Sequence, residues 1–120
     1  MVMAERHKPR PSYVLERGQY DALGESVSPG VPDVFGSPPD DDLTNRLDLA
    51  RWIVSPSNPL TARVAVNRLW QMSFQKGLVP TSEDFGVQGE RPTHPDLLDW
   101  LATELVDSGW DLQAIRRLIV

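Results

Sequence analysis

The polar residues best suited to chemistry lie along a segment that is otherwise apolar. Arg63, Asn67 and Gln71 recur every four residues, so on a helix they form one ridge, with Arg68 beside it. A polar group on a buried helix needs a partner, because an unpaired amide or guanidinium is costly away from water. Two interpretations stay open: the ridge hydrogen-bonds loop carbonyls and carboxylates such as Asp84, or it forms an anion-binding or substrate-lining face.

Histidines and clustered carboxylates give no metal-binding pattern. His7 and His94 are the two histidines of the chain, and neither stands in a metal-ligand motif. His94 lies between a threonine and a proline, which is typical of a helix cap or a loop contact, and it stays among our binding candidates. The three carboxylates of 40–42 are adjacent, whereas a calcium loop spreads its ligands over about 12 residues. We therefore expect the triplet to stabilise a helix start, and we predict no metal site.

Composition excludes several classes of site from these 120 residues. The chain has no cysteine, so it has no disulfide, thiolate zinc site or covalent haem attachment, and we predict no cofactor within it. A net charge of -5 argues against binding nucleic acid through bulk charge. Arg116 and Arg117 follow a short turn, and we interpret them as part of an ordinary helical corner rather than a helix-turn-helix. No apolar stretch reaches roughly 18 residues, so we expect no membrane insertion.

The N-terminal third of the chain is predicted to be irregular. Six of the 11 prolines precede residue 40, and proline removes a backbone donor and favours extended geometry. Tyr13 and Leu15 alternate with their neighbours and predict a strand near 12–17, which must pair because a lone strand is unstable. We assign 1–42 to this extended, Pro/Gly-rich segment and 43–120 to a helical part.

A helical period replaces the strand-like pattern after residue 42. A carboxylate or threonine among 41–44 caps the first predicted helix, Asn58 caps the second with Pro59 at its first position, and Gly77 follows its end after Lys76. The apolar residues of the second helix wrap more than one face, which predicts a buried helix. The predicted helices span about 43–54, 58–76, 93–108 and 111–120, with a loop over 78–91 in which Gly86 and Gly89 permit turns.

The last two helices complete a mainly α fold of about four helices. Thr93 and Asp96 have capping-box spacing at the start of the third helix, Asp111 caps the fourth, and Trp110 and Ile115 have hydrophobic-staple spacing. The fourth helix has barely three turns before the sequence stops. We therefore expect the 120 residues to be a fragment of a larger domain, truncated at its C-terminus.

Several separated motifs resemble one family in the same order. The run from Asn58 to Gln71 (NPLTARVAVNRLWQ), Asp84-Phe85-Gly86 and the run from His94 to Ala102 (HPDLLDWLA) resemble the C-terminal PSD-type domain of unknown function of large planctomycete proteins, which are described as cytochrome-c-like or surface-associated. The resemblance extends upstream over 17–32 and downstream over 109–119, so it covers nearly the whole chain.

The resemblance implies a context rather than an activity. Members are large exported proteins, so it implies a periplasmic or cell-surface location, adjacent domains of the same polypeptide as partners, and haem c elsewhere in the parent protein. This sequence departs from the family where histidines are frequent, because Met72 and Ser73 stand there. Gln75-Lys76 also replaces a pair containing glycine, and Gln113 stands where lysine is common.

Two classes of function follow from these observations. We favour a structural or interaction module that packs on a neighbouring domain, because no acid–base pair or activated nucleophile can be named. The alternative is part of the active-site wall of a haem-linked redox or hydrolytic enzyme that uses the face of Arg63, Asn67 and Arg68, so whether the chain serves an enzyme stays open.

Overall fold

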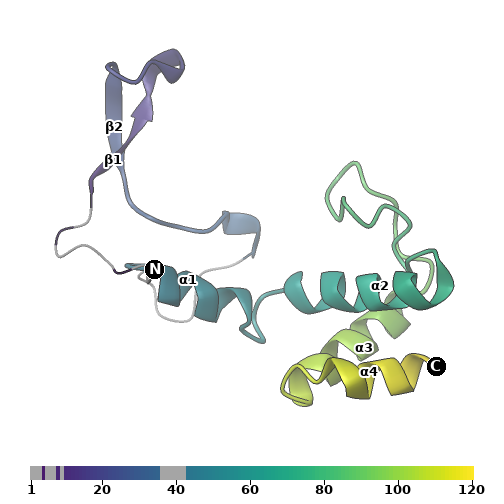
Figure 1. Ribbon diagram of the computed structural model, residues 1–120. Helices are drawn as coiled ribbons and strands as arrows, with labels where there is room; N and C mark the ends of the chain where they lie inside the picture. The colour runs from purple at the N-terminus through teal and green to yellow at the C-terminus, as the bar shows by residue number, and fades with distance from the viewer. Residues whose placement is uncertain (1–3, 5–7, 9, 36–42) are drawn as a thin grey trace. The chain divides into compact units, whose positions relative to one another are not determined.

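A computed structural model describes residues 4, 8, 10–35 and 43–120, and the chain divides into two units, 1–52 and 53–120. His7 and the carboxylates of 40–42 lie outside the described residues. Four α-helices and one short hairpin make up the regular structure of the described part (Figure 1). The predicted mainly α fold with an irregular N-terminal third is confirmed.

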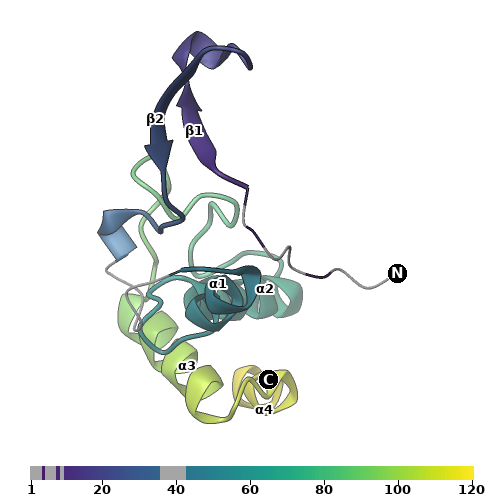
Figure 2. The ribbon, with the colours of Figure 1, turned by 90° about the vertical axis from the view of Figure 1, so that its left-hand side faces the viewer.

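The first unit contains a β-hairpin. Strands β1 (Ser12–Leu15) and β2 (Leu23–Val27) pair antiparallel, with Ser12 opposite Val27 and an irregular register between Tyr13 and Leu15 (Figure 2). The predicted strand is therefore confirmed over 12–15, with a partner that sequence reasoning missed. It ends two residues early because Arg17 and Gly18 adopt positive φ angles of 50° and 75° inside the 3-10 turn Glu16–Gly18.

Helix α1 (Arg46–Ile53) begins three residues later than predicted. Its cap is Asn45, whose Oδ1 accepts hydrogen bonds from the backbone N–H groups of Leu47 and Asp48. The Asp48 carboxylate in turn accepts from the N–H and hydroxyl of Thr44, which completes a reciprocal cap. Trp52 is buried on this helix and its ring lies 6.3 Å from that of Phe35, in the short 3-10 helix Asp33–Phe35.

Helix α2 (Thr61–Phe74) begins and ends inside its predicted limits. The Asn58 Oδ1 accepts from the N–H groups of Leu60 and Thr61, as expected of a capping side chain. The regular helix follows Leu60, so the prediction that Pro59 is its first residue is wrong. The end was predicted wrongly: Gln75 adopts the left-handed conformation at φ 66°, so the helix stops before Lys76. Its burial is also lower than predicted, since Phe74 is half exposed.

Helices α3 (Pro95–Asp107) and α4 (Leu112–Ile119) form the helical corner. The capping box predicted at the start of α3 is wrong, because the Thr93 hydroxyl donates to Leu78 O in the preceding loop instead of receiving an N–H of the helix. Gly109 and Trp110 turn the chain with φ angles of 68° and 66°. Asp111 caps α4 as predicted, accepting from Gln113 N and Ala114 N.

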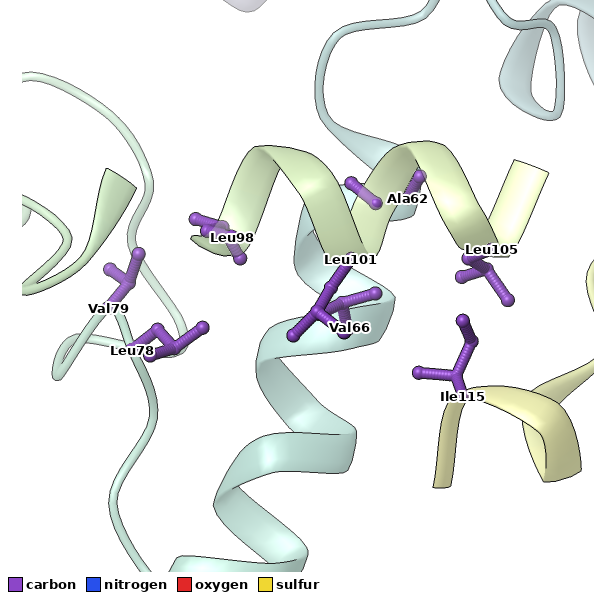
Figure 3. Close-up of a cluster of buried hydrophobic side chains, with 9 residues drawn as sticks. Ala62, Val66, Leu78, Val79, Leu98, Leu101, Leu105 and Ile115 are labelled. Carbon is purple, nitrogen blue, oxygen red and sulfur yellow. The ribbon is translucent and has the colours of Figure 1, made fainter. Parts of the chain in front are cut away.

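The core of the second unit is formed where α3 meets α2 and α4 (Figure 3). Leu105 and Ile115 are almost fully buried and join α3 to α4, while Val66 brings α2 against them. Leu78 and Val79 extend the core into the loop that follows α2. The buried core residues are Ala62, Val66, Leu78, Val79, Leu98, Leu101, Ala102, Leu105 and Ile115.

Candidate functional site

Asn67 is the centre of the polar ridge and is fully buried, with 0% of its surface exposed. Its Nδ2 donates to Val79 O at 3.1 Å and to Ser82 Oγ at 3.2 Å, and its Oδ1 accepts from Val79 N at 2.8 Å. The amide therefore gives Val79 the two hydrogen bonds that a neighbouring strand would supply. The side chain fastens the loop after α2 to the helix and is not open to a ligand.

Gly77 allows the loop to approach Asn67. A Cβ at this position would lie 2.6 Å from Val79 O and 2.7 Å from both amide atoms of Asn67. Its φ is not positive, so the sequence interpretation of Gly77 as a helix stop is wrong. The residue is glycine because the backbone and the Asn67 amide occupy the space of a side chain.

The loop 77–93, called the anchored loop below, is tied by its own hydrogen bonds. Thr81 Oγ1 donates to Asp84 O at 2.9 Å and accepts from Glu90 N at 2.9 Å. The Asp84 carboxylate accepts from Gly86 N at 2.7 Å. Asp84 is thus engaged within the loop, and the predicted pairing of the ridge with Asp84 is replaced by other partners.

Arg63 joins α2 to α3. Its Nε donates to Asp99 Oδ1 at 2.6 Å, and its Nη1 donates to Pro59 O in the residues before α2. The hydrogen bond from Arg63 lowers the pKa of the Asp99 carboxyl below its ordinary 3.8, and the same bond raises the pKa of the Arg63 guanidinium. Both side chains are partly exposed, so the pair is screened by solvent.

Arg63 and Asp99 also line a cleft of about 340 Å³ formed by the start of α2, the residues before it and α3. Its polar lining comes from both helices and from the residues before α2. Its apolar lining comes from prolines, alanines and one valine. The residues lining the cleft are Pro56, Asn58, Pro59, Ala62, Arg63, Asp99, Ala102, Thr103, Val106 and Asp107.

The other candidates make separate contacts. Arg68 is exposed and its Nη2 lies 3.8 Å from Glu83 Oε2, a long surface pair. Gln71 is half-buried, and within residues 43–120 its side chain makes no hydrogen bond. His94 is exposed in front of α3, with Nδ1 3.0 Å from Thr93 Oγ1. Of the five candidates, Arg63 alone lines the cleft.

Sequence reasoning missed the partners that give these residues their roles. Asp99 is 36 positions from Arg63, and Val79 is 12 positions from Asn67, so no local spacing connects them. Over the described ranges, no group of three or more His, Cys, Asp or Glu side chains is arranged to hold a metal ion. No helix of the described residues has the length and apolarity to cross a membrane.

The comparison with known proteins agrees with the motifs of the helical part. No curated protein and no solved structure matches the chain. A family model matches residues 45–120, and the resemblance suggested for 17–32 lies outside it and stays a prediction. The match covers well over half of the chain, including α1 to α4. The chain therefore belongs to the PSD1 family of proteins of unknown function (DUF1553).

Proposed function

We propose that this chain is a structural or interaction module that packs on a neighbouring domain of the same polypeptide. The observation that carries this proposal is the fully buried Asn67, whose amide is used up by three hydrogen bonds to the anchored loop. Arg63 is likewise committed to Asp99 and Pro59. The polar groups best suited to chemistry are therefore engaged in contacts that hold the domain together.

Half-exposed apolar side chains on α3 and α4 support packing against a partner. Trp100 is 48% exposed on α3, and Leu112 and Leu118 are 48% and 52% exposed on α4. Covering apolar surface releases roughly 25 cal/mol per Å², so large half-exposed side chains are the ones that gain from a partner. A docked domain would bury these apolar side chains, which remain half exposed to water in this unit.

The alternative, an active-site wall that uses the face of Arg63, Asn67 and Arg68, has less support. A catalytic group must touch substrate, whereas Asn67 has no exposed surface and Arg68 faces solvent beside Glu83. Arg63 is the member of this face that lines the cleft, and its Nε already donates to a carboxylate.

The proposal has a cellular context that rests on the family resemblance. The polypeptide is of the large, exported planctomycete type, located in the periplasm or at the cell surface. Haem c, which needs cysteines for its attachment, belongs to other parts of that polypeptide in this proposal.

Hydrogen exchange tests the packing. Amide exchange of the 120-residue chain is compared with that of the polypeptide encoded by the complete reading frame. We expect exchange in α3 and α4 to slow by roughly tenfold or more in the longer polypeptide, because a docked domain suppresses local opening. Equal exchange rates in both would contradict the proposal.

A pair of matched variants makes the test specific. Trp100→Glu places a charge in the proposed contact and should remove the extra protection. Met72→Glu changes a residue that is 73% exposed on α2 and should leave it intact. Loss of protection in both variants would point to a general instability instead of a contact at α3.

A further inference from the structure

Asp107 is an unpaired carboxylate at the edge of the cleft. It is exposed, lines the cleft, and its side chain has no hydrogen bond or ion pair within residues 43–120. The other two charges of the cleft, Arg63 and Asp99, neutralise each other at 2.6 Å. The cleft therefore has one uncompensated negative charge.

The position of Asp107 in its helix disfavours this charge. The last turn of α3 contains no basic residue, and Glu104 and Asp107 lie there at the negative end of the helix dipole. Negative side chains are favoured at the other end of a helix, because the C-terminal carbonyls are themselves partially negative. An acidic residue that lies at the unfavourable end of a helix and has no cationic partner in its own chain is a candidate for binding a cation from outside.

The walls of the cleft fit an aliphatic chain. Pro59 and Ala62 line one side and Ala102 and Val106 the other, so the methylenes of a long side chain would meet apolar surface. A volume of about 340 Å³ is at the lower end of the range for small-molecule sites, which begins at roughly 300 Å³. The space suits one long side chain with its backbone.

We propose that this cleft receives an arginine or lysine side chain of the neighbouring domain, with its cationic head on Asp107. This inference rests on the proposed packing function and names the partner's chemistry. The apolar walls hold the methylene stem and the uncompensated carboxylate selects a positive head over a neutral or negative one.

A titration monitored by NMR tests the site in the 120-residue chain. The probe is Nα-acetyl-arginine amide, and the matched uncharged probe is Nα-acetyl-norleucine amide, at equal ionic strength. We expect saturable shifts of amide resonances in 56–63 and 99–107 with the arginine probe and clearly weaker ones with norleucine. Absence of saturable shifts in these segments, or equal shifts with both probes, would overturn the proposal.

Two substitutions in α3 distinguish binding of arginine at the cleft from nonspecific attraction to a negatively charged chain. Asp107→Asn should weaken arginine binding roughly threefold or more, whereas Asp96→Asn removes the same charge from the same helix outside the cleft and should not. Asp107→Asn should also raise the thermal midpoint, because it removes a charge that opposes the helix dipole. Equal binding losses in both variants, or a lower midpoint for Asp107→Asn, would contradict a recognition role.

The occupant is decided by two further measurements. If sedimentation shows that the chain self-associates and that Asp107→Asn abolishes the association, the cleft receives a second copy and the assignment to a neighbouring domain is wrong. The exchange comparison is independent of the titration. Slowed exchange in α3 without arginine binding would contradict the assignment of the cleft. Arginine binding without slowed exchange would support the cleft as a cation site but contradict the proposed packing function.

Discussion

At the scale of residues, we expect Asn67 to stabilise the second unit more than the exposed polar groups of its ridge do, because it is fully buried and hydrogen-bonded. Asn67→Ala leaves the N–H and C=O of Val79 without partners in a buried site, so we expect the free energy of unfolding to fall by about 2–3 kcal/mol. Urea denaturation followed by circular dichroism measures the change.

Gln71→Ala is the matched control for Asn67→Ala. It removes an amide from the next position of the same ridge, where the side chain has no hydrogen bond within residues 43–120. We expect a change within about 0.5 kcal/mol. Equal losses for the two variants would show that the ridge acts through helix propensity and not through the Asn67 contacts.

The Arg63–Asp99 pair makes the free energy of unfolding of the second unit depend on pH in the acid range. Arg63 lowers the pKa of Asp99 below 3.8 in the folded chain, so the unfolded chain binds the proton more readily. The stabilisation is therefore present above the unfolded pKa of about 3.9 and is lost as the pH falls through the lower folded value.

Asp99→Asn tests this response. The variant should be less stable than the wild type near about pH 5, and the difference in unfolding free energy should shrink toward about pH 2. Asp96 lies in the first turn of the same helix and has no Arg partner within residues 43–120, so Asp96→Asn measures the effect of the helix dipole without an ion pair and serves as the control. A difference that is constant with pH would mean that the ion pair does not contribute.

Sequence reasoning identified the important polar residues, and its interpretation that they bond loop carbonyls and carboxylates is confirmed for Asn67 and Arg63, but it did not identify the individual partners. The four-residue spacing of Arg63 and Asn67 is visible along the chain, whereas Asp99 and Val79 become their partners through the packing of α2, α3 and the anchored loop. Gly77 shows the same limit, because a close approach of backbone and amide leaves no signature that differs from a helix stop.

At the scale of elements, caps were predictable where a side chain bonds its own helix. Asn58 and Asp111 act at the predicted positions, since their partners lie within three residues. Thr93 was predicted wrongly because the carbonyl of Leu78, 15 residues away, takes its hydroxyl. The strand β2 was missed because its sequence, LGESV, contains glycine, glutamate and serine between its two apolar ends and lacks the alternation of apolar residues that predicts a strand.

Helix α4 depends on its cap because it has eight residues. Asp111→Ala removes the acceptor of two backbone N–H groups, and we expect a loss of about 1 kcal/mol in unfolding free energy. Asp111→Asn retains an oxygen acceptor and should recover most of this loss. A variant with alanine that is as stable as the wild type would show that Ile115 alone holds α4 in place.

At the scale of the whole molecule, the main core cluster belongs to the second unit, whereas Leu43 and Trp52 are buried in the first unit outside that cluster. The nine buried residues of the core cluster lie between 62 and 115, so none comes from residues 1–52. The hairpin of the first unit has two strands with half-exposed apolar side chains, and a two-stranded sheet is marginal in water by itself. Stability is therefore unequal along the chain.

This inequality predicts that the second unit folds alone. A chain of residues 55–120 keeps the Asn58 cap, the core cluster, the anchored loop and the Arg63–Asp99 pair. We expect it to unfold cooperatively in urea, at the same midpoint urea concentration at which α2, α3 and α4 unfold in the full chain. Hydrogen exchange of the full chain should show faster exchange in β1 and β2 than in α3. A shortened chain without near-ultraviolet circular dichroism, or with a gradual transition, would mean that residues 1–54 contribute packing that the core cluster does not contain.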